Sequence, residues 1–68
     1  MCSLLREYRE RAGKSQTDVA DVMHVDQGRI SKYESGQLRI DIIQLRQYCA
    51  AINVPLADFV AELERRLP

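Results

Sequence analysis

The connection between two short helical segments in the middle of the chain is only three residues long, with the sequence HVD at positions 24–26. Before it, apolar residues recur at helical spacing after Ser15, and beyond it Ile30 and Tyr33 follow the same period. A connection this short forces two helices to cross at a steep angle, as in a helix-turn-helix motif. We therefore expect residues 15–35 to form one compact helix pair.

Helical periodicity runs through the rest of the chain and predicts five helices. The residues expected to face the core are Leu4, Leu5, Tyr8 and Ala12 in the first helix, Val19, Ala20, Val22 and Met23 in the second, Ile30 and Tyr33 in the third, and Ile42, Leu45, Cys49 and Ile52 in the fourth. In the fifth helix one apolar stripe consists of Leu56, Phe59, Val60, Leu63 and Leu67. Helix starts are indicated by Ser15, Asp26, Asp41 and Pro55, and helix ends by Gly13, Gly36 and Asn53. No strand pattern, repeat or linker interrupts the helices, so the prediction is a single all-α domain over residues 1–68.

The composition excludes several classes of function. A chain of 68 residues buries only about 60% of its unfolded surface, which leaves little room for an internal catalytic cleft. No apolar run is long enough to span a membrane and no signal peptide is evident, so a cytoplasmic protein is expected. One histidine and two cysteines without metal-ligand spacing argue against a metal site, and Cys49 is expected to be a small buried hydrophobe.

The charge is balanced over the chain but not along it. Ten basic and ten acidic side chains cancel, so the net charge gives no argument for nucleic acid. Residues 27–54 carry four basic and two acidic side chains, whereas the segments on either side each carry one more acid than base. The electropositive part of the chain therefore includes the third predicted helix.

The amino-acid sequence of the helix pair is informative beyond the length of its connection. The stretch SQTDVADVMHVDQGRISKYESG resembles the helix-turn-helix core of the phage repressor and Cro family, also called the XRE family. Matching features are SQ opening the second helix, VA at its centre, IS inside the third and YESG closing it. The first helix, LREYRERAGKSQ, and the boundary AINVPLADF between the last two helices are also similar to the family. The resemblance implies a five-helix, lambda-repressor-like fold that binds double-stranded DNA.

The resemblance also implies roles for individual residues. The third helix would enter the major groove with Gln27, Gly28 and Lys32 at base edges and Arg29 and Ser31 beside them. A carboxamide suits adenine and an ammonium group suits guanine, which favours Gln27 and Lys32 as the most informative contacts. Phosphate contacts are expected from Ser15, Gln16, Ser35, Gln37 and Arg39. Lys14 replaces the family's usual apolar residue, either as an added phosphate contact or as a solvated lysine.

Three further expectations concern the scaffold. In the family a residue like Arg9 pairs with one like Glu34, which would fix the third helix against the first; the alternative is two ordinary surface charges. His24 stands where many members carry glycine, because the position favours positive φ. Gly28 lies inside the third helix, where it either permits close approach to DNA or is a neutral exposed site.

Members of the family bind palindromic operators as two-fold dimers, so a homodimer is expected. In the last helix Leu56, Phe59 and Val60 would close the monomer core, leaving Leu63 and Leu67 for the dimer interface; the alternative is that the whole stripe packs internally. Enzyme motifs are absent, and no cofactor or small-molecule ligand is expected. The function expected is a transcriptional regulator, most simply a repressor. The main alternative is an antitoxin or adaptor of the same fold whose partner is a protein, such as a toxin.

Overall fold

The computed structural model describes residues 2–67 and contains five helices over that range. They are α1 (Cys2–Arg11), α2 (Gln16–Met23), α3 (Gln27–Ser35), α4 (Ile42–Ala51) and α5 (Leu56–Arg66). Residues 2–67 contain no strand, which confirms the predicted all-α class, and the pair α2 and α3 falls within the predicted range 15–35. The side chain of Cys2, for which the sequence indicates no role, lies outside the described part.

Each helix start in the middle of the chain is capped by the side chain that the sequence indicated. Ser15 and Asp18 form a reciprocal capping box at α2, each accepting a hydrogen bond from the other's backbone N–H at 2.9–3.0 Å. Asp26 accepts from the backbone of Arg29 at 2.8 Å, and Asp41 caps α4 in the same way. Local sequence therefore fixes where α2, α3 and α4 begin.

Three helices end with the same backbone closure. A residue in the left-handed region follows α1, α2 and α4, namely Gly13 (φ 70°), His24 (φ 59°) and Asn53 (φ 59°). In each case the next residue donates its N–H to a carbonyl five residues earlier, as from Val25 to Ala20 at 3.0 Å. The prediction that His24 takes the conformation usual for glycine is confirmed. The left-handed residue ends α2 within one residue of Met23, and this is why the connection to α3 needs only three residues.

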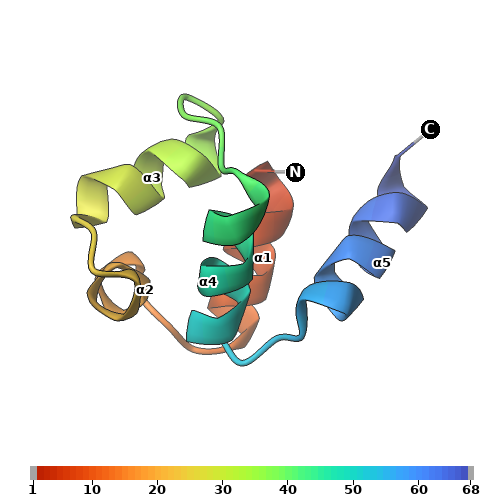
Figure 1. Ribbon diagram of the computed structural model, residues 1–68, viewed down its shortest axis with the longest axis horizontal. Coiled ribbons are helices and arrows are strands. Elements are labelled where there is room, and N and C mark those ends of the chain that lie inside the picture. The colour runs from red at the N-terminus through yellow and green to blue at the C-terminus, as the bar shows by residue number, and fades with distance from the viewer. Residues whose placement is uncertain (1, 68) are drawn as a thin grey trace.

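The core lies where all five helices meet. Its fully or nearly fully buried apolar residues are Leu4, Leu5, Val19, Ala20, Met23, Ile30, Tyr33, Leu45, Tyr48, Cys49, Ile52 and Phe59. Figure 1 shows α2 and α3 at one end of the molecule and α5 at the other. Helix α2 packs on α3 and α4, α3 on α1, and α5 on α4. This arrangement leaves the outer side of α3 uncovered.

Helix α5 is tied to α1 as well. The rings of Tyr8 and Phe59 lie 5.5 Å apart between their centroids, and Arg66 Nη1 contacts Glu7 Oε2 at 2.7 Å. The arginine also pairs with Glu62 on its own helix at 2.8 Å. The last helix is therefore held by an aromatic contact at one level and a surface ion pair at another.

Four residues predicted to face the core do not. Val22 and Ile42 are 58% and 59% exposed, Val60 is 38% exposed, and Ala12 is exposed just beyond the end of α1. The first two lie in the end turns of their helices, where a neighbouring helix covers only the centre of an apolar stripe and leaves its flank in water. Conversely, Leu63 is partly buried against the core. Val60 is therefore more exposed, and Leu63 more buried, than the sequence suggested.

Candidate nucleic-acid interface

The outer side of α3 is polar and open. Ile30, Tyr33 and Glu34 are buried and face the core, so the 3.6-residue period turns Gly28 and Lys32 directly outward. We define the recognition face as Gln27, Gly28, Arg29, Ser31 and Lys32, the five residues predicted at or beside base edges. All but Ser31 are exposed, and Ser31 is half-buried. The structure therefore places the five residues on one helix, with a residue that has no side chain at the centre and longer polar side chains on each flank.

Behind this face lies a buried ion pair between α1 and α3. Arg9 Nε donates to Glu34 Oε2 at 2.7 Å and Arg9 Nη2 donates to Glu34 Oε1 at 3.0 Å, so the expected pair is present and bidentate. Both side chains are at least nine-tenths buried. Arg9 Nη1 also donates to the carbonyl of Lys14 at 2.9 Å, which attaches the turn before α2 to the same cation. The alternative of two independent surface charges is wrong.

The carboxylate of Glu34 also gathers uncharged donors. The hydroxyl of Tyr48 on α4 donates to Glu34 Oε2 at 2.7 Å, and Gln16 Nε2 on α2 donates to Oε1 at 3.2 Å. Burial by itself would raise the pKa of Glu34, but the hydrogen bonds from Arg9, Tyr48 and Gln16 outweigh it and hold the pKa below the ordinary value. The carboxylate therefore stays charged, and four helices meet at one ion.

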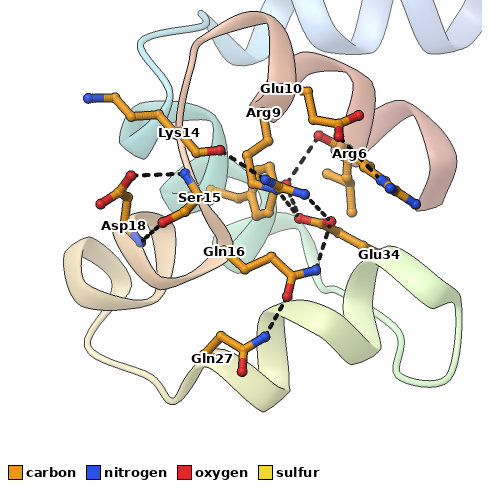
Figure 2. Close-up of polar contacts among 11 residues, drawn as sticks. Arg6, Arg9, Glu10, Lys14, Ser15, Gln16, Asp18, Gln27 and Glu34 are labelled. Carbon is orange, nitrogen blue, oxygen red and sulfur yellow. Dashed lines mark hydrogen bonds and ion pairs between the residues drawn. The ribbon is translucent and has the colours of Figure 1, made fainter.

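This network continues to the recognition face. Gln16 accepts a hydrogen bond on Oε1 from Nε2 of Gln27, so the side chains form a chain from Arg9 through Glu34 and Gln16 to Gln27 (Figure 2). Within residues 2–67, no hydrogen bond uses Oε1 or the second amide hydrogen of Gln27. These are the acceptor and donor that a carboxamide needs to bind adenine at two points. The first residue of α3 is therefore fixed by the scaffold through only one of the hydrogen-bonding groups of its amide.

The expected phosphate contacts lie at two ends of the helix pair. The backbone N–H groups of Gln16 and Thr17 begin α2, where the helix dipole favours an anion. The carboxylate of Asp18 lies in the same turn, with its pKa lowered by hydrogen bonds from Ser15, and opposes that attraction. Ser15 still has a hydroxyl proton to donate, because its Oγ only accepts in the cap. This end is thus polar but not strongly cationic.

The other end follows α3. Ser35, Gln37 and Arg39 are all exposed around the left-handed turn at Gly36 (φ 82°), with Ser35 Oγ bonded to the carbonyl of Lys32 at 3.2 Å. Arg39 is the one of the three that carries charge. The structure brings them to the same end of α3, although no hydrogen bond joins Gln37 or Arg39 to another side chain within residues 2–67.

Arg6 is a residue that the sequence reasoning did not select. It lines a half-open hollow of about 150 Å³ together with Gln16, Ser31, Glu34 and Ser35. Arg6 is largely exposed and pairs loosely with Glu10 at 3.6 Å. Its position three residues before Arg9 was the available signal, since that spacing puts both side chains on one side of α1. Tyr33, Tyr48 and Gln44 were missed as hydrogen-bonding residues, because only tertiary contacts give their hydroxyl and amide groups partners.

The two residues predicted for the dimer interface on α5 differ in how exposed they are. Leu67 is 56% exposed, whereas Leu63 packs partly against the core. A second group of exposed apolar side chains lies around the start of α4 and consists of Leu38, Ile42 and Ile43. Exposed apolar side chains therefore occur both at the end of α5 and around the start of α4.

The described residues give little support for a metal site, a reactive cysteine or a membrane-spanning helix. Among residues 2–67, no three histidine, cysteine or acidic side chains are grouped as metal ligands. Burial raises the pKa of Cys49 to about 11, which keeps the thiol protonated and unreactive. None of the helices between residues 2 and 67 is long and apolar enough to cross a bilayer.

A family model and solved structures that match this chain are all helix-turn-helix proteins or gene regulators. The sequence matches the helix-turn-helix family HTH_3 over residues 5–59. An XRE-family like protein from Pseudomonas syringae pv. tomato str. DC3000 superposes with a TM-score of 0.89 at 30% identity, over 98% of this chain and 82% of that one.

The clp gene regulator ClgR from Corynebacterium glutamicum superposes in two crystal structures. One has a TM-score of 0.88 at 24% identity over 98% of this chain and 87% of that one; the other has 0.83 at 26% over 90% and 65%. No curated protein sequence matches the chain.

Proposed function

The chain belongs to the XRE family of helix-turn-helix proteins, which are DNA-binding transcription regulators and not enzymes, and from this we propose that it is a repressor that binds a palindromic operator as a homodimer. Helix α3 enters the major groove and presents its recognition face to base edges. A protein bound at a promoter blocks transcription without needing a surface that contacts RNA polymerase, so repression is the simplest outcome.

One observation carries the proposal, the hydrogen-bonded chain that ends at Gln27. Recognition of a base by two hydrogen bonds needs a side chain that is already in place, because ordering a free glutamine on binding costs side-chain entropy. The ion pair of Arg9 and Glu34 supplies a rigid origin for that chain. A solvated helix face with no binding role has no need of it.

The remaining contacts follow from position. Lys32 projects outward from the middle of α3 and donates to guanine acceptors, with Arg29 and Ser31 on the flanks. Ser15 and Gln16 hold a phosphate at the start of α2, and Ser35, Gln37 and Arg39 hold one after α3. Each good base contact contributes about 1–3 kcal/mol of discrimination.

A second subunit supplies the second half-site. We place the dimer interface on the outer edge of α5, where Leu67 and Val60 are exposed and the uncovered part of Leu63 lies between them. Two-fold dimers of this kind read half-sites about 34 Å apart.

Selection of binding sites from random duplexes tests the proposal. We expect a palindrome with half-sites one helical turn apart, and loss of preference at one base pair per half-site in Gln27→Ala. Ser3→Ala, an exposed polar change on α1, is the control that should leave the selected sequence unchanged. Recovery of random sequence with the wild-type protein would reject the proposal.

An antitoxin or adaptor whose main partner is a protein remains the second candidate, because three apolar side chains around the start of α4, Leu38, Ile42 and Ile43, are exposed to solvent. A gel shift with the DNA flanking the gene separates the two. A pure adaptor shifts no DNA at any salt concentration, whereas a repressor shifts it at low salt.

A further inference from the structure

The two flanks of the recognition face are anchored by different helices. Gln27, on one flank, is bonded to Gln16 of α2. Arg29, on the opposite flank, donates from Nη1 to the hydroxyl of Tyr33 at 3.3 Å, and that hydroxyl donates to Oε1 of Gln44 on α4 at 2.7 Å. The guanidinium is therefore connected to the scaffold through a second chain, which does not touch the first.

We propose that Tyr33 and Gln44 are positioning residues that hold the Arg29 guanidinium at the edge of the recognition face for contact with DNA acceptors. This inference rests on the proposed DNA-binding function and adds to it two residues that face the protein and not the DNA.

The position of Tyr33 indicates that its hydroxyl serves to orient Arg29 and is not needed for core packing. Its ring is buried in the core, and the whole residue is only 2% exposed, yet its hydroxyl lies at the edge where Arg29 is exposed. A phenylalanine would fill the same space in the core. The hydroxyl is thus not required for packing, and what it contacts is one exposed cation and one amide oxygen.

The direction of the hydrogen bonds also fits. A tyrosine hydroxyl has one proton, and Gln44 Oε1, at the shorter distance, accepts it. The lone pairs on the tyrosine oxygen then face Arg29, which can only donate. Gln44 therefore fixes the orientation of the hydroxyl, and the hydroxyl fixes Arg29 through one of its five donors. The others stay free for a pair of acceptors on DNA, either N7 and O6 of a guanine or the oxygens of a phosphate.

A double-mutant cycle tests the coupling. Tyr33→Phe, Arg29→Ala and the double variant are titrated against the duplex selected with the wild-type protein and against a scrambled duplex of the same composition. Loss of one orienting hydrogen bond should weaken specific binding by about three- to ten-fold in Tyr33→Phe. The double variant should bind no more weakly than Arg29→Ala alone, because the hydroxyl acts only through the arginine.

Tyr48→Phe is the matched control. It also removes a tyrosine hydroxyl and leaves the ring intact, but that hydroxyl bonds Glu34, in the chain of hydrogen bonds that ends at Gln27. Its effect should add to that of Arg29→Ala. Gln44→Leu, which removes the acceptor, should reproduce Tyr33→Phe in sign and in its coupling to Arg29.

Two further measurements distinguish a contact of Arg29 with guanine from a contact with phosphate. If Arg29 binds guanine, Tyr33→Phe relaxes preference at one base pair per half-site. If it binds phosphate, Tyr33→Phe lowers affinity equally on all sequences, and Arg29→Ala lowers the magnitude of the slope of log K against log salt by about 0.9 per subunit. Additive effects of Tyr33→Phe and Arg29→Ala, or wild-type affinity in a folded Tyr33→Phe, would overturn the inference. Failure of the wild-type protein to select any duplex would instead reject the proposed function.

Discussion

Glu34 is the residue on which most of the interface depends, because α1, α2 and α4 all donate to its carboxylate from Arg9, Gln16 and Tyr48. Burying a charge is costly unless every lone pair is satisfied, and here each oxygen has two donors. No buried side-chain nitrogen or oxygen within residues 2–67 lacks a hydrogen-bond partner. Glu34, at the end of α3, therefore sets the position of Gln27, at its start, through Gln16.

Glu34→Gln should lower the free energy of unfolding by about 3 kcal/mol, since it leaves the Arg9 cation buried without a counter-charge. Urea denaturation at pH 7, followed by circular dichroism, measures the change. Glu10→Gln is the matched control, because Glu10 makes only an exposed contact with Arg6 and should change stability by less than about 0.5 kcal/mol. Equal losses in the two variants would mean that the buried pair contributes nothing special.

Gly28 is not required by the protein's own packing. A β-carbon at this position would meet only Oδ1 of Asp26 at 3.4 Å, an ordinary contact, and its φ is not in the left-handed region. Gly28→Ala should therefore raise stability by up to about 1 kcal/mol through helix propensity.

If the missing side chain permits close approach to DNA, the same variant should bind the selected duplex at least about ten-fold more weakly. Thermal unfolding and a binding titration on the same preparation measure both effects. Unchanged affinity would make Gly28 a neutral exposed site.

At the scale of elements, the α2–α3 junction depends on His24 in the left-handed region (φ 59°, ψ 41°). His24→Gly removes strain of about 1 kcal/mol at the β-carbon but adds about 0.4–1 kcal/mol of entropy to the unfolded chain. We therefore expect a neutral to slightly stabilising change in melting temperature.

Asn53→Gly is the comparison, because Asn53 has the same φ at the end of α4 and asparagine tolerates it better than histidine. His24→Gly should come out more favourable than Asn53→Gly. The reverse order would indicate that the imidazole makes a stabilising contact.

Helix α5 offers the test of assembly. Leu67→Asp should shift the protein from dimer to monomer in sedimentation equilibrium at tens of micromolar, because it places a charge in the proposed interface. Ile43→Asp, at an equally open apolar position (62% exposed) near the start of α4, is the control. Dissociation by Ile43→Asp alone would move the interface to α4.

The same elements show what the sequence could predict. Helix starts at Ser15, Asp26 and Asp41 depend on contacts within three residues, so the pattern of side chains was sufficient. The exposure of Val22 and Ile42 depends on which flank of a helix its neighbours cover, and periodicity does not determine that.

In the candidate site, the positions on α3 and the pair of Arg9 and Glu34 were predicted from the family resemblance. The hydrogen bonds that orient Gln27 and Arg29 join separate helices, and only the packed fold brings their atoms within reach.

For the molecule as a whole, acid is the condition that should test both the interface and the fold. The carboxyl of Glu34 has its pKa lowered, since its three donors outweigh burial, and the pKa of Glu7 is lowered by its hydrogen bond to Arg66. A carboxyl whose pKa is lower in the folded state stabilises the fold above its unfolded pKa of about 4.3 and loses that contribution as pH falls through the folded value. We therefore expect stability to fall between about pH 5 and pH 3.

Glu34→Gln should flatten this pH dependence more than Glu7→Gln, because the side chain of Glu34 is only 4% exposed and that of Glu7 is 41% exposed. Urea denaturation at half-unit steps from pH 7 to pH 3, in low and high salt, measures the difference. Salt should shrink the contribution of Glu7 and leave that of Glu34, since screening acts mainly on exposed charges. A Glu34→Gln profile parallel to that of the wild-type protein would show that the charge of Glu34, and with it the rigid origin proposed for Gln27, does not govern the fold in acid.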